Sequence, residues 1–273
     1  MPQAIVFKYS GAGNDFILAD GRGYGSPVLS IQEIISLCDR EKGFRASDGR
    51  VGADGVIILE ESEKAPFRMN FFNPDGSTGM MCGNGGRCIV DFAAFLGISP
   101  ASGKYVFEAP DGIHEAWILS REGQNSVVRL SMRDAFDLRR LNGGLFLNTG
   151  TRHFVKFVDD IEKVDVGKEG SRIRHSAEFA PEGTNVDFVE IRCDGSICVR
   201  TFEKGVEAET LACGTGIVAS AIAASLRKGD AAGREVHTEV HSRISELSVD
   251  FIPVKDPAVV ATGIFLTGPV ERF

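Results

Sequence analysis

The sequence predicts an α+β protein made of two related halves, each with strands arranged around one buried helix. Two observations support this prediction. A Cys-Gly-x-Gly motif opens an apolar helix twice, once at Cys82 and once at Cys213. At the offset that separates these cysteines, residues 183–189 align with residues 52–58, and Phe202 aligns with Phe71. The pattern indicates a duplicated domain.

The first half begins with a strand pattern over residues 4–9, a turn over 10–15 and a second strand over 16–19. The Gly-x-Gly in this turn leads into a strand, which excludes a dinucleotide-binding loop. Residues 30–33 match a capping box, and apolar spacing predicts a helix over 31–38 that stops near Gly43. Cys38 is expected in the core.

Strands predicted over residues 56–59 and 67–72 lead through a turn at 73–77 to the Cys82 motif. The helix that follows, residues 84–96, is apolar nearly all round and should therefore be buried. Residues 105–132 return to short strands and turns, and Trp117 is expected in a core.

The second half repeats this plan. Residues 149–153 align with residues 10–14, each ahead of an apolar strand, and the helix predicted over 217–226 is again apolar on all sides. Asp194 and Gly195 predict a hairpin turn between Cys193 and Cys198, which, like Cys88, are expected to be structural.

Composition indicates a soluble globular protein of 273 residues, 43% hydrophobic and 25% charged. Residues 1–14 lack a signal-peptide pattern, so we expect a cytoplasmic location. The apolar stretch at 217–226 is far shorter than the roughly 20 residues that cross a bilayer. A net charge of −8 argues against nucleic acid. None of the six cysteines forms a Cys-x-x-Cys pair. We therefore expect most of them to be free thiols, and we expect neither a zinc site nor a disulfide framework.

Each cysteine motif places a thiol and several backbone N–H groups at a helix N-terminus, which favours negative charge. We therefore expect a lowered cysteine pKa and an anion held by backbone amides. The amides in question belong to Gly83, Asn84, Gly214 and Thr215.

When two acid–base thiols lie on opposite faces of one carbon, one can remove a proton from its face and the other can deliver a proton to the opposite face. The result is inversion of that carbon. We expect the two helix N-termini to face each other across a cleft for this purpose. The sequence has no P-loop, three-glycine nucleotide turn or metal-ligand spacing, so no cofactor and no metal are predicted.

The chain resembles the diaminopimelate epimerase family, pyridoxal-independent enzymes that interconvert the LL and meso forms of diaminopimelate on the bacterial route to lysine and peptidoglycan. The resemblance covers essentially the whole chain. The matching segments are residues 13–16 (Gly-Asn-Asp-Phe), 73–77 (Asn-Pro-Asp-Gly-Ser), 82–88 (Cys-Gly-Asn-Gly-Gly-Arg-Cys), 182–185 (Glu-Gly-Thr-Asn), 203–205 (Glu-Lys-Gly) and 209–216 (Glu-Thr-Leu-Ala-Cys-Gly-Thr-Gly).

The resemblance implies two pseudo-symmetric domains, each a barrel-like, mostly antiparallel sheet wrapped around a central buried helix. It implies a first domain of residues 1–131, completed by a last strand at about 264–273, and a second domain of residues 132–263. It also implies a homodimer and a symmetric diamino diacid as substrate.

Site residues follow from the same resemblance. Cys82 and Cys213 are implied as the acid–base pair, with His153 and Glu203 tuning the thiols. The implied substrate ligands are Asn14, Asn73, Gly83, Asn84, Thr151, Asn185, Glu203, Lys204, Gly214 and Thr215.

Three positions depart from the family pattern. Lys204 replaces the usual arginine, which removes a planar fork for a carboxylate. Thr151 and Arg152 replace an Asn-Pro pair, and Arg152 adds a guanidinium that can compensate for Lys204. Gly55 stands where some members carry glutamine.

Simpler interpretations stand beside these. Asn14, Asn73 and Asn185 are typical turn residues, His153 is a satisfied, partly buried histidine, and Glu203 with Lys204 is an exposed pair worth about 0–1 kcal/mol. Two other functions remain open: a racemase or epimerase of a different amino acid that uses the same cysteines, and a redox-responsive thiol protein with a Cys82–Cys213 disulfide.

Overall fold

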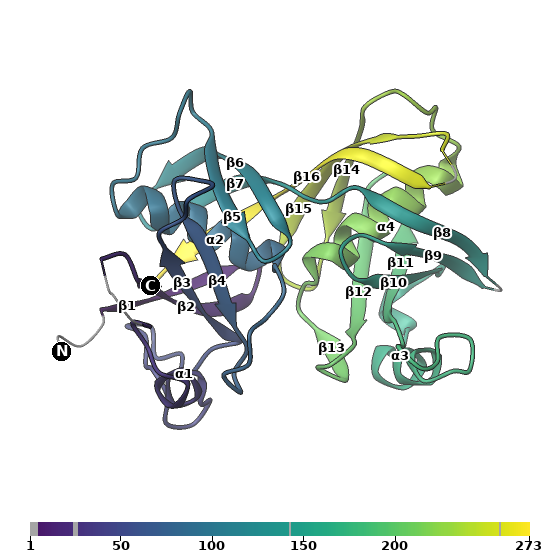
Figure 1. Cartoon of the computed structure of the whole chain (residues 1–273). Coiled ribbons are helices and arrows are strands. Elements are labelled where there is room, and N and C mark those ends of the chain that lie inside the picture. Colours follow the sequence, from purple (N-terminus) through teal and green to yellow (C-terminus); the bar gives the residue numbers. More distant parts are fainter. Residues whose placement is uncertain (1–4, 24–26, 142, 257) are drawn as a thin grey trace. The chain divides into compact units, whose positions relative to one another are not determined.

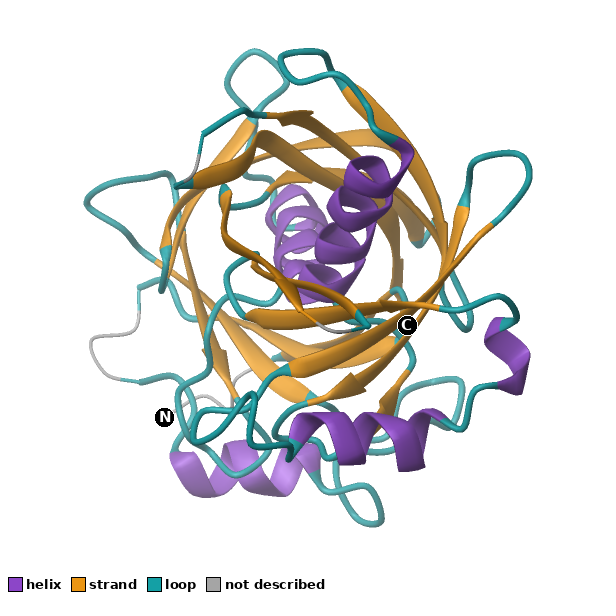
Figure 2. Cartoon of the chain, turned by 90° about the vertical axis from the view of Figure 1, so that its right-hand side faces the viewer, coloured by secondary structure: helices purple, strands orange, loops and turns teal. Residues whose placement is uncertain are grey.

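The computed structural model describes residues 5–23, 27–141, 143–256 and 258–273. The chain forms two compact units, one of Met1–Leu130 with Gly268–Phe273 and the other of Ser131–Thr267 (Figure 1). Within each unit, strands surround one long helix (Figure 2).

In the first unit, the sheet closes on itself. Among the described residues its strands follow the order β1 (Val6–Gly11), β2 (Asn14–Asp20), β3 (Gly55–Glu60), β4 (Arg68–Phe72), β5 (Tyr105–Ala109), β6 (Gly112–Glu122), β7 (Asn125–Ser131) and the end of β16 (Val259–Arg272). Antiparallel pairing of Tyr9 with Arg272 joins β1 to β16 and completes a barrel. A closed sheet leaves no unpaired edge strand.

Helix α2 (Gly83–Phe95) lies inside this barrel, and its residues from Gly83 to Ala93 are all buried. Strand β1 approaches it so closely that a Cβ at Gly11 would lie 2.6 Å from the carbonyl oxygen of Asn84. Phe92 packs against the rings of Phe7 and Tyr9 on the same strand. The apolar composition of the helix is therefore explained by its enclosure on all sides.

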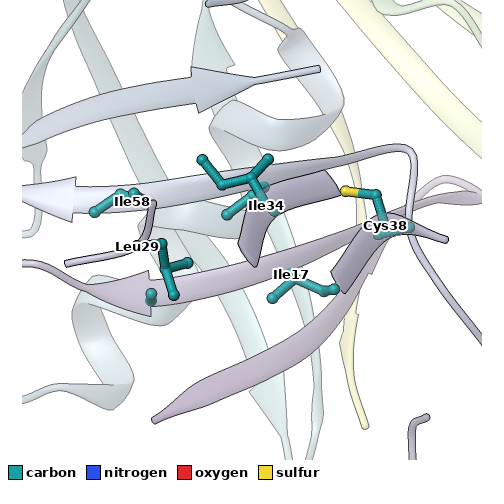
Figure 3. Close-up of a cluster of buried hydrophobic side chains, with 8 residues drawn as sticks. Ile17, Leu29, Ile34, Cys38 and Ile58 are labelled. Atoms are coloured by element: carbon teal, nitrogen blue, oxygen red, sulfur yellow. The ribbon is translucent and has the colours of Figure 1, made fainter. Parts of the chain in front are cut away.

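Helix α1 (Ile31–Cys38) covers the outside of the barrel. The predicted capping box is confirmed, since Ser30 and Glu33 satisfy each other's backbone N–H groups. Ile34 and Cys38 pack onto Ile17 of β2 and Ile58 of β3 (Figure 3). Cys38 is thus a core residue, as predicted.

The second unit has the same plan. Its strands are β8 (Ala135–Leu141), β9 (Gly144–Asn148), β10 (Arg152–Phe157), β11 (Asn185–Ile191), β12 (Ile197–Glu203), β14 (Val236–His241), β15 (Glu246–Pro253) and the start of β16, with β13 (Ala208–Thr210) added beside β12. Pairing of β16 with β8 closes this barrel around α4 (Gly214–Lys228). Helix α3 (Val166–Arg174) and the 3₁₀ turn η1 (Ile161–Lys163) lie outside it.

The order of elements repeats between the units. Parallel pairs β2–β3 and β4–β5 of the first correspond to β10–β11 and β12–β14 of the second, and the other pairings are antiparallel. Helices α1 and α3 occur at equivalent places, as do α2 and α4. The predicted α+β class, with a barrel-like and mostly antiparallel sheet around a central helix in each half, is confirmed.

Several predicted boundaries were wrong in detail. Helix α4 begins at Gly214, well before residue 217, because the glycines of its first turn belong to the helix. Helix α1 ends at Cys38, with Asp39 as its C-cap, and not near Gly43. Trp117 is half-buried, since β6 is a long strand with one face turned outward. Ala4, predicted to start the first strand, lies outside the described residues.

Within the described part of the chain, no helix is long and apolar enough to cross a membrane.

The packing of helix α3 against β12 can be tested with two glycine variants. A Cβ at Gly170 would overlap Phe202 of β12, whereas at Gly167 its nearest neighbour is Asp165 at 3.8 Å. Gly170→Ala should lower the free energy of unfolding by about 1–3 kcal/mol through overpacking. Gly167→Ala should raise it by about 0.5–1 kcal/mol, because glycine is a poor helix former. Urea denaturation of both variants measures this, and equal effects would contradict the packing described.

Candidate active site

Both cysteines occupy the N-cap position of the helix enclosed by their own barrel. Cys82 has φ −110° and ψ 121°, and Cys213 has φ −110° and ψ 111°, so the two motifs share one backbone conformation. The first helical bonds run from Gly86 N–H to the Cys82 carbonyl and from Ile217 N–H to the Cys213 carbonyl, at 2.7 and 2.8 Å. The amides before these residues therefore lie outside the helical ladder, where an anion can be bound.

At the first cysteine, the neighbouring charge is positive. Arg87 is fully buried in α2, where its guanidinium donates to the Asn84 side chain at 2.8 Å and to the Gly83 carbonyl at 3.3 Å. Burial lowers the pKa of Arg87 to about 10, while the charges of Cys88 and Cys82 act to raise it. The guanidinium is therefore a cation at neutral pH, and a buried cation favours the thiolate form of a nearby cysteine.

The side chain of Asn84 connects this helix to the turn between β1 and β2. Its Nδ2 donates to Oδ1 of Asn14 at 2.6 Å, and Nδ2 of Asn14 donates to Asp54 at 3.0 Å. Predicted ligands Asn14 and Asn84 are thus brought together. Each amide orientation is fixed by a bonded partner.

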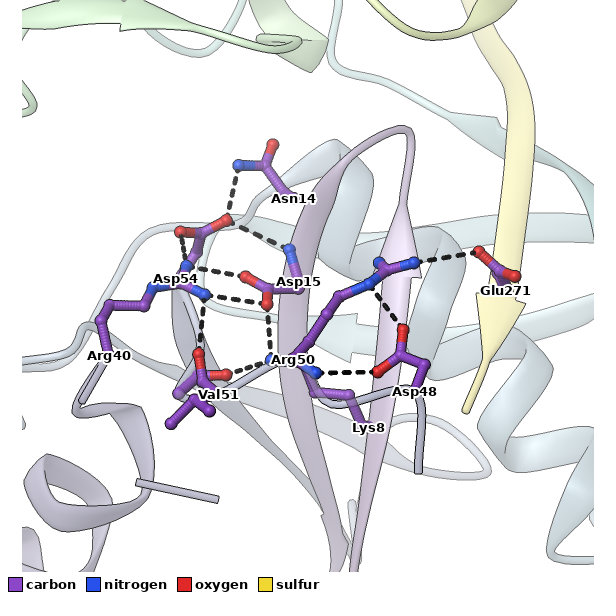
Figure 4. Close-up of polar contacts among 10 residues, drawn as sticks. Lys8, Asn14, Asp15, Arg40, Asp48, Arg50, Val51, Asp54 and Glu271 are labelled. Atoms are coloured by element: carbon purple, nitrogen blue, oxygen red, sulfur yellow. Dashed lines mark hydrogen bonds and ion pairs between the residues drawn. The ribbon is translucent and has the colours of Figure 1, made fainter. Parts of the chain in front are cut away.

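An ionic network beneath Asn14 holds the turn in place (Figure 4). Asp15 accepts from Arg40 at 2.7 Å and pairs with the buried Lys8 at 2.5 Å, and Arg40 also binds Asp54. Burial acts to raise the pKa of Asp15, but hydrogen bonds from Arg40 and Lys8 outweigh it and lower the pKa overall. The carboxylate therefore stays charged and anchors the start of β2.

Asn73 lies in the turn after β4. Its Nδ2 donates to the Ser77 hydroxyl at 3.0 Å, and the Asn73 N–H donates to the Ser77 carbonyl at 2.9 Å. The turn interpretation of this asparagine is therefore correct, whatever further contacts it makes with a ligand.

At the second cysteine, a chain of polar side chains leads inward. The Sγ atom of Cys213 lies 3.5 Å from the Thr215 hydroxyl, which lies 2.9 Å from Nε2 of His153. The Thr151 hydroxyl lies 2.9 Å from both Nε2 of His153 and the Thr215 hydroxyl. Thr151, His153 and Thr215 are thus brought together around this helix N-terminus, and His153 is fully buried there.

Asp187 is the site residue that the sequence prediction missed. Its Oδ2 lies 2.7 Å from Nδ1 of His153, and its Oδ1 accepts from Thr201 at 2.7 Å. The signal was present in the repeat, because Asp187 aligns with Val56, a fully buried apolar residue of the first unit. A charge at a position whose counterpart is buried and apolar indicates a buried charged site.

Asn185 links two further predicted residues through the backbone. Its Nδ2 donates to the Arg152 carbonyl at 3.0 Å, and its Oδ1 accepts the Lys204 N–H at 2.8 Å. The Arg152 guanidinium pairs with Glu182 at 2.9 Å, so the cation suggested as a substitute for Lys204 has a carboxylate partner already.

The expected lowering of the cysteine pKa was wrong for Cys213. Burial raises the pKa of this thiol well above its ordinary value, and the carboxylates of Glu203 and Asp187 raise it further. Contacts from the Thr215 hydroxyl and the Gly216 amide act in the opposite direction but are outweighed. Desolvation with two nearby anions thus exceeds the effect of the helix N-terminus, and Cys213 is a neutral thiol at pH 7.

The other cysteines do not join these sites. All six cysteines, each of which lies within the described residues, are free thiols. Burial raises the pKa values of Cys38, to about 11, and of Cys88 and Cys198, as expected for structural thiols. Among the described residues, no group of three or more His, Cys, Asp or Glu side chains is arranged to hold a metal ion.

Comparison with solved structures identifies the class of fold. A Bacillus anthracis protein of the phenazine biosynthesis PhzF family superposes with a TM-score of 0.72 at 15% identity, covering 98% of this chain and 96% of that one. A probable proline racemase from Agrobacterium radiobacter gives 0.63 at 18% identity, covering 98% and 90%. At these identities the likeness establishes the fold alone.

Sequence comparison is more specific. The profile of the diaminopimelate epimerase family matches residues 6–134 and 145–263. The diaminopimelate epimerase of Chlorobaculum tepidum is 43% identical over 267 residues, covering 96% of both chains, and that of Flavobacterium psychrophilum is 38% identical over 266 residues, covering 97% of this chain and 96% of its own. The chain belongs to the diaminopimelate epimerase family.

The raised pKa of Cys213 is directly measurable by alkylation. Iodoacetamide reacts with the thiolate, so the alkylation rate of Cys213 should rise with a midpoint above the ordinary thiol value of 9.0. Glu203→Gln removes a nearby anion and should move this midpoint to lower pH. Peptide mass spectrometry follows the rate, and Glu246→Gln, an exposed carboxylate of the same unit, is the matched control. A Cys213 midpoint below 9 in the wild type would contradict the burial described.

Proposed function

We propose that this protein is a cofactor-independent epimerase that interconverts LL- and meso-diaminopimelate, with Cys82 and Cys213 as the two acid–base groups. The family assignment supports the activity and places it in lysine biosynthesis. The observation that carries the mechanism is the duplication of a cysteine N-cap with one backbone conformation. A two-base inversion needs two equivalent groups of this kind.

The two half-sites differ in charge, and this difference supports a division of labour. Arg87 is a buried cation beside Cys82, whereas Glu203 and Asp187 are anions beside Cys213. We infer that Cys82 is the thiolate and Cys213 the thiol before a substrate binds with its α-proton facing Cys82. Cys82 then takes the α-proton and Cys213 delivers its own proton to the opposite face of the carbanion.

Backbone amides at the two helix N-termini suit the α-carboxylate of the substrate. Gly83, Asn84, Gly214 and Thr215 supply N–H groups before the first helical bond of α2 or α4. Fixed N–H donors stabilise charge that spreads into the carboxylate when the α-proton leaves. These N–H groups also bind the carboxylate before the reaction. They accelerate the reaction only to the extent that their hydrogen bonds become stronger in the transition state.

The remaining predicted ligands suit the polar groups of a symmetric diamino diacid. Asn14, held by Asn84 and Asp54, presents an oriented amide, and Asn73 offers another from its turn. We propose that Asn185, Glu203 and Lys204 bind the end of the substrate that does not react, with Lys204 pairing with a carboxylate and Glu203 with an ammonium group.

Two further properties are proposed: a cytoplasmic location, and a homodimer as implied by the family resemblance. Analytical ultracentrifugation tests the second directly, because a monomer has a mass of 29.4 kDa. A single species at that mass would exclude the dimer.

Turnover of LL-diaminopimelate by purified protein tests the function. Chiral chromatography should show conversion to the meso form without added pyridoxal phosphate or metal. Cys82→Ala and Cys213→Ala should each lower kcat by about 10³-fold or more, because each removes a group that must exchange a proton in every turnover. Cys193→Ala, which replaces an exposed cysteine, is the matched control and should retain full activity. Full activity in either of the first two variants would overturn the two-base mechanism.

A racemase or epimerase of another amino acid is the second candidate, favoured by Lys204 and Thr151 in place of the usual family residues. Proline, hydroxyproline, glutamate and diaminopimelate should be compared by kcat/KM in one assay. A strong preference for diaminopimelate excludes the alternative, and a preference for another amino acid replaces the proposed substrate. Lys204→Arg should lower KM for a diacid while leaving kcat nearly unchanged, since it strengthens binding away from the reacting carbon.

A further inference from the structure

We propose that Asp187 is a positioning residue that holds His153 as the Nδ1–H tautomer, so that Nε2 exchanges protons with Cys213 through the Thr215 hydroxyl. The proposal rests on the proposed function and deepens it, because it states how a buried thiol loses and regains its proton. No residue of the other unit is needed for this chain of contacts.

The pairing of Asp187 with His153 is completely buried. Both side chains have no solvent exposure, and Oδ2 lies 2.7 Å from Nδ1. The other carboxylate oxygen accepts the Thr201 hydroxyl at 2.7 Å. A carboxylate can only accept hydrogen bonds, so the hydrogen in the short contact with the ring belongs to Nδ1. In neutral imidazole the second nitrogen then carries the lone pair, which makes Nε2 the acceptor.

Nε2 of His153 faces two hydroxyl groups. The hydroxyl oxygens of Thr151 and Thr215 lie 2.9 Å from Nε2 and 2.9 Å from each other. Thr215 also lies 3.5 Å from Sγ of Cys213, within hydrogen-bond range for sulfur. The path from the thiol to the ring nitrogen thus requires a single intervening hydroxyl.

The proton step along this path is balanced. The S–H bond of Cys213 breaks and its proton passes to Oγ1 of Thr215, while the hydroxyl proton of Thr215 passes to Nε2 of His153. The sulfur keeps the electron pair as a thiolate, and the imidazolium is stabilised by the carboxylate of Asp187. The reverse transfer, from Nε2 through Oγ1 of Thr215 to the sulfur, restores the thiol and the neutral ring, so the exchange itself consumes no other reactant.

The first turn of α4 fixes the position of the pair. A Cβ at Gly216 would overlap Oδ1 of Asp187 and lie 3.2 Å from Cε1 of His153. The helix that carries Cys213 therefore packs directly onto the carboxylate and the ring. Only glycine leaves room for this contact, and any larger residue would displace the pair or the helix.

The tautomer of His153 can be measured without substrate. Side-chain ¹⁵N chemical shifts of the wild type should show a protonated Nδ1 and an unprotonated Nε2. Asp187→Asn should change this pattern, because an amide both donates and accepts. A wild-type spectrum with the hydrogen on Nε2 would overturn the proposal.

Variants of Thr215 test the connection to Cys213 and leave the Asp187–His153 pair in place. Thr215→Val keeps the shape but removes the hydroxyl, and Thr215→Ser keeps the hydroxyl. A rise of one unit in the pKa of Cys213 lowers its thiolate fraction at a given pH about tenfold. The alkylation rate of Cys213 at pH 8 should therefore fall about tenfold or more in Thr215→Val but remain near wild type in Thr215→Ser. Cys82, alkylated in the same sample, is the internal reference.

Turnover provides a second readout. Asp187→Asn and Thr215→Val should lower kcat about 10²-fold with little change in KM, as expected for loss of acid–base assistance. Asp250→Asn removes the partner of His237 at 2.6 Å in an exposed pair of the same unit and should leave kcat unchanged. Equal Cys213 alkylation in Thr215→Val and Thr215→Ser would overturn the proposal even if Asp187→Asn failed to fold.

The outcomes separate this proposal from the proposed function. If the wild type does not convert diaminopimelate but the tautomer and alkylation pattern are as described, the relay stands and the substrate assignment falls. If turnover is normal in Thr215→Val, the epimerase stands and the relay is wrong.

Discussion

Enclosure of an apolar helix within a closed sheet is the constraint on which the rest of this structure depends. A barrel of eight described strands buries such a helix on all sides, so that only its ends are available for polar chemistry. At the N-terminal end the first backbone N–H groups have no helical partner, and a cysteine stands at the N-cap in both units. The proposed catalytic group and the proposed anion-binding groups are therefore provided by one structural element.

Duplication of this element provides two similar scaffolds, and the surrounding charges make them chemically different. The first thiol has the buried guanidinium of Arg87 as a neighbour, and the second has the carboxylates of Glu203 and Asp187. The proposed division into one thiolate and one thiol rests on this difference, because a cation stabilises a thiolate and an anion opposes it. A reaction that needs one base and one acid at the start is supported by this asymmetry.

Much of this organisation was predictable from the sequence. The two Cys-Gly motifs, the all-apolar helices and the capping box at Ser30 each correspond to a local pattern with a physical cause, and the fold class follows from them. The pKa of Cys213 was not predictable in this way, because it depends on burial and on residues distant in sequence. The charge at Asp187 was detectable from its alignment with the apolar Val56, but its partner was not, because His153 becomes a neighbour only through parallel pairing of β10 with β11.

The central claim is that two thiols invert one carbon by exchanging protons on its opposite faces. Its most direct test is epimerisation of LL-diaminopimelate in deuterated water, with the α-deuterium content of substrate and product measured at low conversion. The account predicts meso product that carries solvent deuterium at the inverted carbon, alongside recovered LL substrate that is still unlabelled. Meso product that keeps the original α-hydrogen would contradict it, because a single base would then have served both faces.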